Sequence, residues 1–223
     1  MKNQIKVILM AAAVLGSVSV AKADSMSLAY LIAHSGASDG SGSLTIGDKV
    51  FDNFGSTSSS SLYASVNIST VTYNTLYGID ITGVTTGDLL LTYSVHTVGG
   101  SYLISDVHQD MVVTGTGDYS ASVSESVGSD QNMTQASDPS FTYAWQYGSL
   151  SGSHLSDQMN LYTPLQIVWI NKDIDVSIID GTLEVNHIYQ TFSQVTVPDG
   201  GITFAFLSFA LVSVEGLRRK LKH

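Results

Sequence analysis

One candidate functional site in this chain is a pair of carboxylates. Asp173 and Asp175 stand two residues apart in a segment rich in Ile and Val. Residues two apart on a β-strand point to the same side, so both carboxylates could share a Ca²⁺ ion with a neighbouring loop. Any solvent-facing acidic strand shows the same spacing, and no EF-hand-like series of ligands accompanies the pair. Calcium is therefore one of two interpretations of this pair, and no other metal site is predicted.

A second candidate is a run of alternating aromatic residues in the segment FTYAWQY, residues 141–147. Phe141, Tyr143, Trp145 and Tyr147 fall on one side if the segment is a strand. On an exposed sheet these rings would form a platform on which sugar rings stack. Buried, they would fill the core of a β-sandwich. The sequence leaves both interpretations open.

Catalytic signatures are absent from the sequence. The chain has no cysteine, which removes disulfides, thiolate metal sites and a cysteine nucleophile together. No HExxH motif occurs among the six histidines, and no GxSxG motif occurs among the serines. We predict no catalytic residue and no enzyme activity, because a hydrolase would need carboxylates brought together from distant parts of the chain.

Charge is distributed unevenly along the 223 residues. Between residues 24 and 201 only Lys49 and Lys172 are basic, against 18 acidic residues. The other basic residues lie close to the two ends. An acidic body of this kind is repelled by phosphate backbones, which excludes nucleic acid as a partner.

The first 23 residues have the pattern of an export signal. Lys2 and Lys6 precede an apolar stretch, and Ala21-Lys22-Ala23 places small residues at the −3 and −1 positions of a cleavage site. We predict cleavage by signal peptidase after Ala23. The alternative, an N-terminal membrane anchor, is disfavoured because the apolar stretch is short and the cleavage pattern follows it directly.

At the other end, an apolar run at residues 202–217 is followed by a basic cluster. The run is slightly shorter than the usual 17–25 residues of a spanning helix. Basic residues hold such an end in the cytoplasm, so this segment is predicted to be a transmembrane helix. The alternative is a helix buried in the globular body, which does not account for the cluster. The cluster consists of Arg218, Arg219, Lys220 and Lys222.

These three features in order resemble the PEP-CTERM class of sorting signal. The stretch VPDGG, residues 197–201, is similar to the VPDSG-CTERM variant, with Gly200 in place of its serine. The matching residues are Val197, Pro198, Asp199 and Gly201, with Arg218, Arg219 and Lys220 in the tail. The resemblance implies recognition and cleavage near the motif by an exosortase, a multi-spanning membrane transpeptidase.

The body carries a weaker resemblance to exported PEP-CTERM proteins. Segments 42–54, 115–127 and 171–195 look like parts of those proteins, most of which have no known activity. The resemblance implies a location at the cell envelope or cell surface, and no reaction.

The body of the chain, which contains the Asp173–Asp175 pair and the aromatic segment 141–147, is predicted to consist of β-strands. In YSASVSESV, residues 119–127, serine alternates with mostly apolar residues, as in a strand with one face in water. Asp180-Gly181 lies between two alternating runs and predicts a tight hairpin turn. Turns are also predicted at 98–100 and 115–117, and loops at 35–43, 55–61 and 128–140. We expect an all-β fold, an antiparallel two-sheet sandwich.

The predicted organisation is a signal peptide at 1–23, a β-sandwich at 24–196 and a sorting signal at 197–223. The preferred function is a non-enzymatic cell-surface or extracellular-matrix protein, exported and processed by signal peptidase and an exosortase at the membrane. A binding module for extracellular polysaccharide, with Ca²⁺ as its only candidate cofactor, is the alternative.

Overall fold

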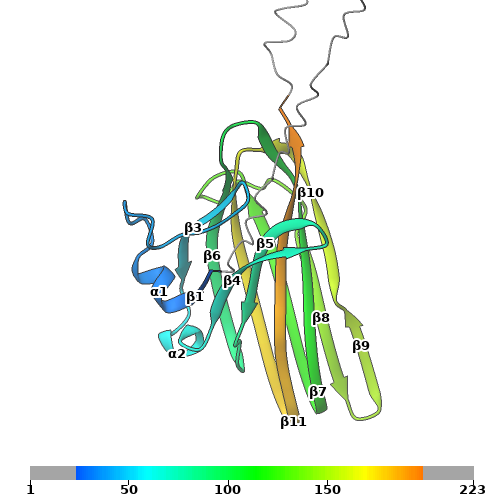
Figure 1. The fold of residues 1–223 in the computed structure, drawn as a ribbon. Helices are drawn as coiled ribbons and strands as arrows, with labels where there is room; N and C mark the ends of the chain where they lie inside the picture. Colours follow the sequence, from blue (N-terminus) through cyan, green and yellow to red (C-terminus); the bar gives the residue numbers. More distant parts are fainter. Residues whose placement is uncertain (1–23, 198–223) are drawn as a thin grey trace, which may run out of the picture.

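The computed structural model describes residues 24–197. The elements are β1 (Ser25–Ser27), α1 (Leu28–Ala33), β2 (Leu44–Ile46), β3 (Lys49–Ser56), α2 (Ser60–Tyr63), β4 (Asn67–Tyr73), β5 (Leu76–Thr82), β6 (Gly87–Thr97), β7 (Tyr102–Gly128), β8 (Ser140–Tyr147), β9 (Leu150–His154), β10 (Ser156–Leu165) and β11 (Ile167–Thr196). Every pairing between strands is antiparallel. The all-β class is therefore confirmed (Figure 1).

Two very long strands form the centre of the fold. β7 and β11 pair with each other from Trp169 opposite Gly128 to Thr196 opposite Tyr102. The predicted alternation is present along them, with Val123 buried and Ser124 at the outer surface of β7. Such alternation is what makes one side of each strand suitable for a core.

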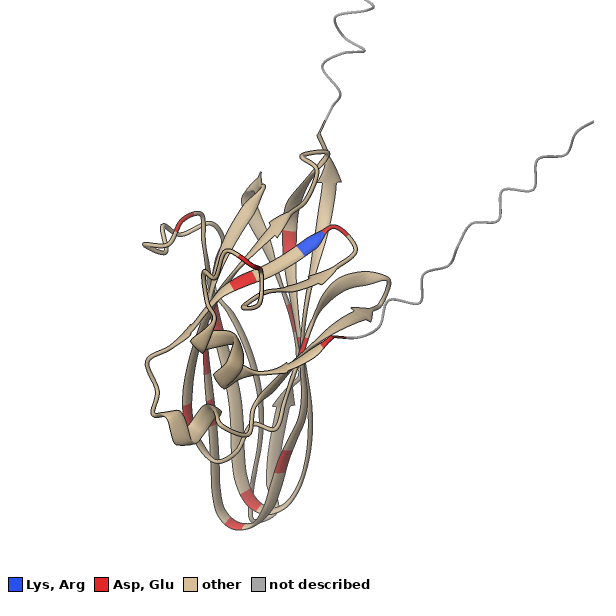
Figure 2. Cartoon of the chain, turned by 60° about the vertical axis from the view of Figure 1, so that its left-hand side comes forward, with Lys and Arg blue, Asp and Glu red and all other residues tan. Residues whose placement is uncertain are grey.

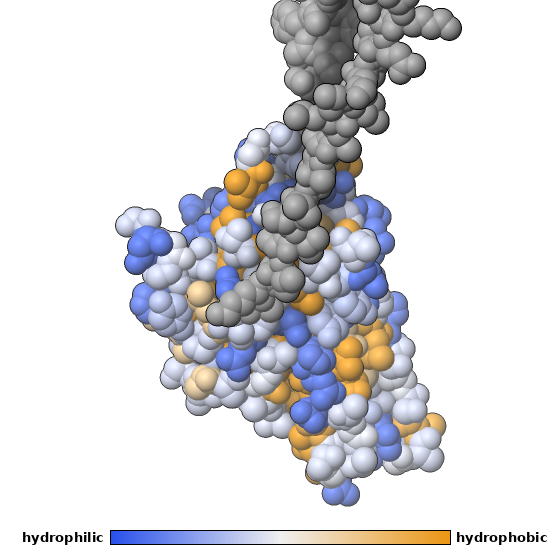
Figure 3. Space-filling view, viewed as in Figure 1, coloured by the Kyte–Doolittle hydropathy of each residue, from blue (hydrophilic) through white to orange (hydrophobic). Residues whose placement is uncertain are grey.

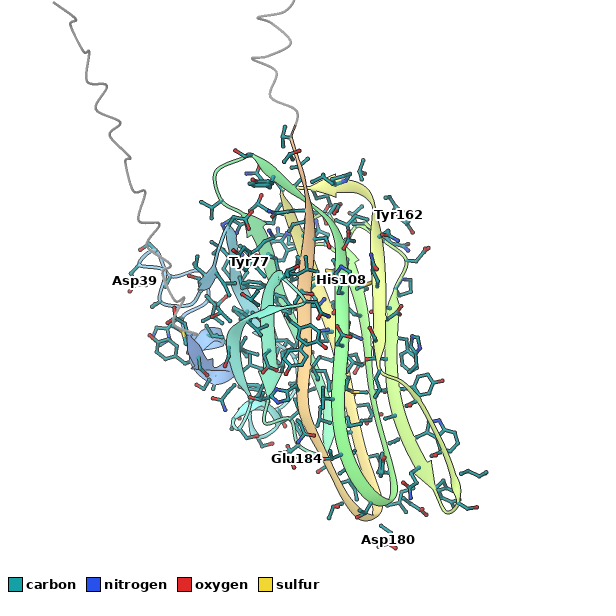
Figure 4. The ribbon with its side chains drawn as sticks, turned by 45° about the vertical axis from the view of Figure 1, so that its right-hand side comes forward. Asp39, Tyr77, His108, Tyr162, Asp180 and Glu184 are labelled. Atoms are coloured by element: carbon teal, nitrogen blue, oxygen red, sulfur yellow. The ribbon has the colours of Figure 1, made fainter. Side chains whose placement is uncertain are left out.

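The β7–β11 ribbon folds back on itself. Lys172 pairs with Glu125 and Gln190 pairs with Gln109, two rungs that are 18 residues apart along β11. An extended strand would separate them by roughly 60 Å. Instead, Lys172 Nζ lies 2.5 Å from Gln109 Oε1. The ribbon therefore bends, and Asp180 marks the bend at the lower end of the molecule (Figure 4).

Bending the ribbon creates two layers that face each other. Layer A contains β2, β3, β6, β8, β9 and the ribbon segments 119–128 and 167–178. Layer B contains β1, β4, β5, β10 and the ribbon segments 102–112 and 185–196. The rings of Phe51 in layer A and Phe192 in layer B pack with centroids 5.8 Å apart. The predicted pair of separate sheets is thus one hydrogen-bonded sheet of 11 strands, folded into two layers.

The prediction of a hairpin turn at Asp180-Gly181 is wrong. The two runs on either side of it belong to the same strand, β11, and each pairs with β7 rather than with the other. The turn predicted at 115–117 likewise lies within β7. The strands do change direction at both glycine sites. Gly117 and Gly181 pair at the bend of the ribbon, with φ of +79° and +95°. The turn at 98–100 is confirmed between β6 and β7.

The core lies between the layers, and the small helices cover one side of it. Leu28 and Leu31 of α1 are fully buried, and the Ser27 side chain caps this helix by accepting a hydrogen bond from the backbone N–H of Tyr30. Acidic residues are spread over several strands while basic ones are scarce (Figure 2). Hydrophobic residues also reach the surface among hydrophilic ones (Figure 3).

Candidate functional site

The aromatic residues of β8 lie on the outer surface of layer A. Ser140, Thr142 and Ala144 of this strand point into the core and are buried. The alternate positions therefore face outward: Phe141 is 48% exposed, Trp145 37% and Tyr147 62%, and Tyr143 is partly buried. The rings of this segment therefore lie at the surface and do not fill the core, and sugar binding by them stays a prediction. We call these four residues the aromatic face.

Neighbouring residues hold the rings of the aromatic face in place. The rings of Phe141 and Tyr143 lie with centroids 5.6 Å apart, and the ring of His154, which pairs with Tyr143 from β9, lies with its centroid 6.1 Å from that of Tyr143. Gly152 of β9 pairs with Trp145. A Cβ atom at Gly152 would be 2.8 Å from the indole Nε1, so the absence of a side chain there makes room for the ring.

Hydroxyl groups lie beside the rings. An open groove of about 400 Å³ is lined by Phe141, Tyr143 and Trp145 together with Ser120 and Ser122 of β7. Aromatic rings next to hydroxyls provide both a stacking surface and hydrogen-bonding groups. This combination suits a ligand with apolar ring faces and polar edges.

A row of acids borders the serines. In register across layer A, Asp175 of β11 pairs with Ser122 on one side and with Asp88 of β6 on the other. Partial burial, a hydrogen bond with Asp88 and repulsion from Asp88 and Asp175 all raise the pKa of the Asp173 carboxyl. The structure thus places both predicted calcium candidates, Asp173 and Asp175, on one outward face. Within residues 24–197 it contains no cluster of three His, Cys, Asp or Glu side chains arranged to hold a metal ion.

The main site missed by sequence reasoning is a buried polar cluster between the layers. Lys172 is fully buried and contacts the carboxylate of Glu125 and the side-chain oxygen of Gln109. Burial lowers the pKa of Lys172, and burial raises the pKa of Glu125, although each partner partly offsets the effect on the other. Gln109 in turn donates to Thr142 Oγ1 at 2.9 Å. Lys172, Glu125, Gln109 and Thr142 are called the buried cluster below.

A signal for the buried cluster is present in the sequence. Lys172 occupies the same phase of the alternation as Ile170 and Ile174, which face the core. Glu125 likewise stands in phase with Val123 and Val127. A charged residue at an apolar phase of a strand indicates a buried partner of opposite charge.

Most of the predicted sorting residues fall outside the described residues. These are the cleavage-site residues Ala21 and Ala23, the motif residues Pro198, Asp199, Gly200 and Gly201, the run at 202–217 and the basic residues Arg218, Arg219, Lys220 and Lys222. Val197 is described: it is exposed, and its N–H donates to the carbonyl oxygen of Ser101 at 2.9 Å. Within residues 24–197 no helix has the length and apolar character needed to cross a bilayer.

Comparison with known proteins identifies no family for this chain. No family model and no curated protein matches the sequence. One similar solved structure is the crystal structure of the enzymatically active domain of bacteriophage CBA120 tailspike protein 4, at 12% identity and a TM-score of 0.29. The match covers 69% of this chain and 20% of the tailspike chain. A likeness this low carries no argument about function.

Proposed function

We propose that this chain is a non-enzymatic exported protein of the cell envelope or cell surface, sorted and processed by an exosortase through residues 197–223. The observation that carries the proposal is where the body ends. β11 ends at Thr196, and Thr196 and Val197 are both exposed, directly before the remainder of the sorting motif. A processing enzyme at the membrane can therefore reach the chain without unfolding the body.

The orientation of the body fits display away from a membrane. The end of β11 and the ribbon bend lie at opposite ends of the molecule (Figure 1). The backbone N–H of Gly148, directly after β8, donates to Asp118 Oδ1 at 2.6 Å beside that bend. If the C-terminal segment is held at the membrane, the aromatic face extends toward the distal end.

Intact-mass measurement of the protein from its native cells tests this proposal. We expect a species that begins at Asp24 and has been cut near residues 197–201, and a longer species in cells that lack the exosortase. A variant with Gln at 218, 219, 220 and 222 should be processed less efficiently. An unprocessed C-terminus in cells that contain an active exosortase would contradict the proposal.

A second candidate function is binding of extracellular polysaccharide, and the exposure of the aromatic face favours it. Phe141, Trp145 and Tyr147 place apolar ring surface in water, where it is unfavourable unless a ligand covers it. Sugar rings would stack on these side chains, and Ser120 and Ser122 would hydrogen-bond their hydroxyls. Asp173 and Asp175 would accept further hydrogen bonds or share a Ca²⁺ ion with the glycan.

Charge narrows the ligand class. The acidic row of Asp88, Asp173 and Asp175 repels carboxylated and sulfated glycans at short range. A neutral or amino-sugar polymer is therefore the better fit. If Ca²⁺ bridges the acids and the glycan, this preference should weaken when Ca²⁺ is added and return when EDTA removes it.

Glycan-array binding by Trp145→Ala tests the second candidate. A nucleic-acid base stacked on an aromatic side chain contributes about 1–3 kcal/mol, and a sugar ring would cover the indole in the same way, so loss of the indole should weaken binding at least about fivefold. Tyr30→Ala is the matched control, because Tyr30 is also exposed but lies on α1, away from the aromatic face. Equal binding by the wild type and Trp145→Ala would argue against this function, while leaving the sorting proposal intact.

A further inference from the structure

The two lysines of the body have the same unusual surroundings. Lys49 and Lys172 are the only basic residues apart from histidine between residues 24 and 197, and both are buried. Lys172 contacts Gln109 and Glu125, and Lys49 contacts Gln194 and Asp48. Each lysine therefore reaches from layer A to a glutamine amide of layer B, with a carboxylate at its amine.

Hydrogen bonds fix the orientation of the amide at Lys172. The Nε2 group of Gln109 donates to the carbonyl oxygen of Val123 at 3.1 Å and to Thr142 Oγ1 at 2.9 Å. Oε1 is therefore directed at Lys172 Nζ, 2.5 Å away. The carbonyl carbon Cδ is bonded to that oxygen, so the amine and the amide carbon are held next to each other.

We propose that Lys172 and Gln109 become joined by an isopeptide bond, with Glu125 as the acid–base group. Glu125 accepts a proton from the Lys172 ammonium, and the neutral amine attacks Cδ of Gln109. A new bond forms between Nζ and Cδ, and the bond between Cδ and Nε2 of Gln109 breaks. Glu125 passes that proton to Nε2, which leaves as ammonia, and then accepts the second proton that Nζ must lose to become an amide nitrogen, so that Glu125 ends protonated. No oxidant, reductant or further reactant is needed.

The surroundings favour each of these steps. Burial favours the neutral forms of both groups, a free amine at Lys172 and a protonated carboxyl at Glu125, which is the state that follows the first proton transfer. The second oxygen of Glu125, Oε1, faces the Gln190 side chain but makes no close hydrogen bond among the described residues, so it can take part in proton transfer. Holding the amine against the amide replaces a slow encounter in solution with a reaction between fixed neighbours.

The bond would link the two halves of the fold. Gln109 lies in the 102–112 segment of β7 and Lys172 in the 167–178 segment of β11, in opposite layers. The link would prevent the folded ribbon from opening at the bend. Because the chain has no cysteine, this link would restrain the fold covalently as disulfides do in many exported proteins.

The cluster at Lys49 provides an internal comparison. Its carboxylate, Asp48, is 21% exposed, whereas Glu125 is fully buried. Water reaches Asp48, so the pair at Lys49 lacks the closed surroundings that enclose Lys172 and Glu125. We therefore expect the crosslink at Lys172 and make no such assignment for Lys49.

Peptide mapping of the full-length folded protein tests the proposal without any variant. After denaturation and digestion at acidic residues, tandem mass spectrometry should find the Lys172 peptide joined to the Gln109 peptide, lighter than their sum by one ammonia. If separate linear peptides with intact Lys172 and Gln109 account for the material, the proposal is wrong. A crosslink found only between Lys49 and Gln194 would also overturn it.

Two variants test the role of each group. Lys172→Arg keeps the positive charge but removes the amine, and it should give only linear peptides. Glu125→Gln keeps the size of the side chain but cannot exchange protons, and it should also stay linear in the folded state, as judged by circular dichroism. A folded Glu125→Gln protein that crosslinks as fast as the wild type would refute the acid–base role. If either variant fails to fold, the digest of the wild-type protein still decides.

Discussion

Gly117 and Gly181 pair directly with each other at the bend of the β7–β11 ribbon, and both have positive φ. A Cβ atom at Gly181 would be 2.0 Å from the carbonyl oxygen of Thr116. We predict that Gly181→Ala lowers the free energy of unfolding by more than the roughly 1 kcal/mol that this backbone region costs by itself, because the new Cβ would also meet this oxygen. Urea denaturation measures this loss.

Gly148→Ala is the control for this prediction. Gly148 also has positive φ, +57°, but no atom lies within 4 Å of the position that its Cβ would take. It should cost about 1 kcal/mol, the backbone term alone. Equal losses in the two variants would show that the close approach at the bend is not important.

Gly152→Val is predicted to weaken polysaccharide binding although every aromatic residue is kept. A side chain at Gly152 would meet the indole of Trp145, which would have to move from its present position on the aromatic face. We expect affinity to fall about as much as in Trp145→Ala, and calorimetric titration with the best array ligand measures it. Ser151→Val is the control, since Ser151 pairs with Gln146 and not with Trp145. Unchanged affinity in Gly152→Val would show that the position of the indole does not control binding.

Regular alternation along a strand is enough to predict which side chains face outward. The outward serines of β7 and the outward Asp173 and Asp175 of β11 lie as predicted, because a period of two leaves only two arrangements for each strand. In the Phe141–Tyr147 segment the alternation places the four rings on one side, but it does not distinguish the inner face from the outer face. That choice depends on Thr142 and Ala144 packing inward, which is a tertiary effect.

The bend shows why the rest could not be predicted. Asp180-Gly181 has the composition of a hairpin turn, and a lone hairpin would fold there. In the structure Gly117 lies opposite Gly181, so two strands change direction together and the ribbon continues. The pairing joins residues that are distant in the sequence, a separation over which local patterns carry no information. The same holds for Lys172 and Gln109, which meet only because the ribbon folds back.

Asp173→Asn is predicted to change how stability depends on pH. The pKa of Asp173 is raised in the folded state, so folding favours its protonated form. Its contribution to stability is present below the unfolded pKa of about 3.9 and is lost as the pH rises through the higher folded pKa. The variant should therefore not show this decline. At neutral pH its free energy of unfolding should exceed that of the wild type by a few tenths of a kcal/mol, which lies within the about 0.2–1 kcal/mol expected when an exposed like-charge contact is removed.

Asp39→Asn is the control for the pH prediction because its sign is opposite. Hydrogen bonds from Ser41 lower the pKa of Asp39, so its contribution is present above the unfolded pKa and is lost as the pH falls through the folded pKa. Urea midpoints between pH 3 and pH 7 should therefore shift in opposite directions for the two variants. If the urea midpoints of Asp173→Asn and the wild type depend on pH in the same way, Asp88, Asp173 and Asp175 do not repel one another appreciably.

Deleting residues 197–223 is predicted to release the body from cells without unfolding it. Among the described residues, the deletion removes one backbone hydrogen bond, which Val197 donates to Ser101 at the end of β11, and the buried core lies within residues 28–192. Fractionation should move the protein from the membrane fraction to the medium, and its melting temperature should match that of the processed native protein. The variant with Gln at 218, 219, 220 and 222 separates retention from folding, since it should be retained poorly while melting at the same temperature. Aggregation of the deleted protein, or a much lower melting temperature, would mean that the C-terminal segment packs into the core.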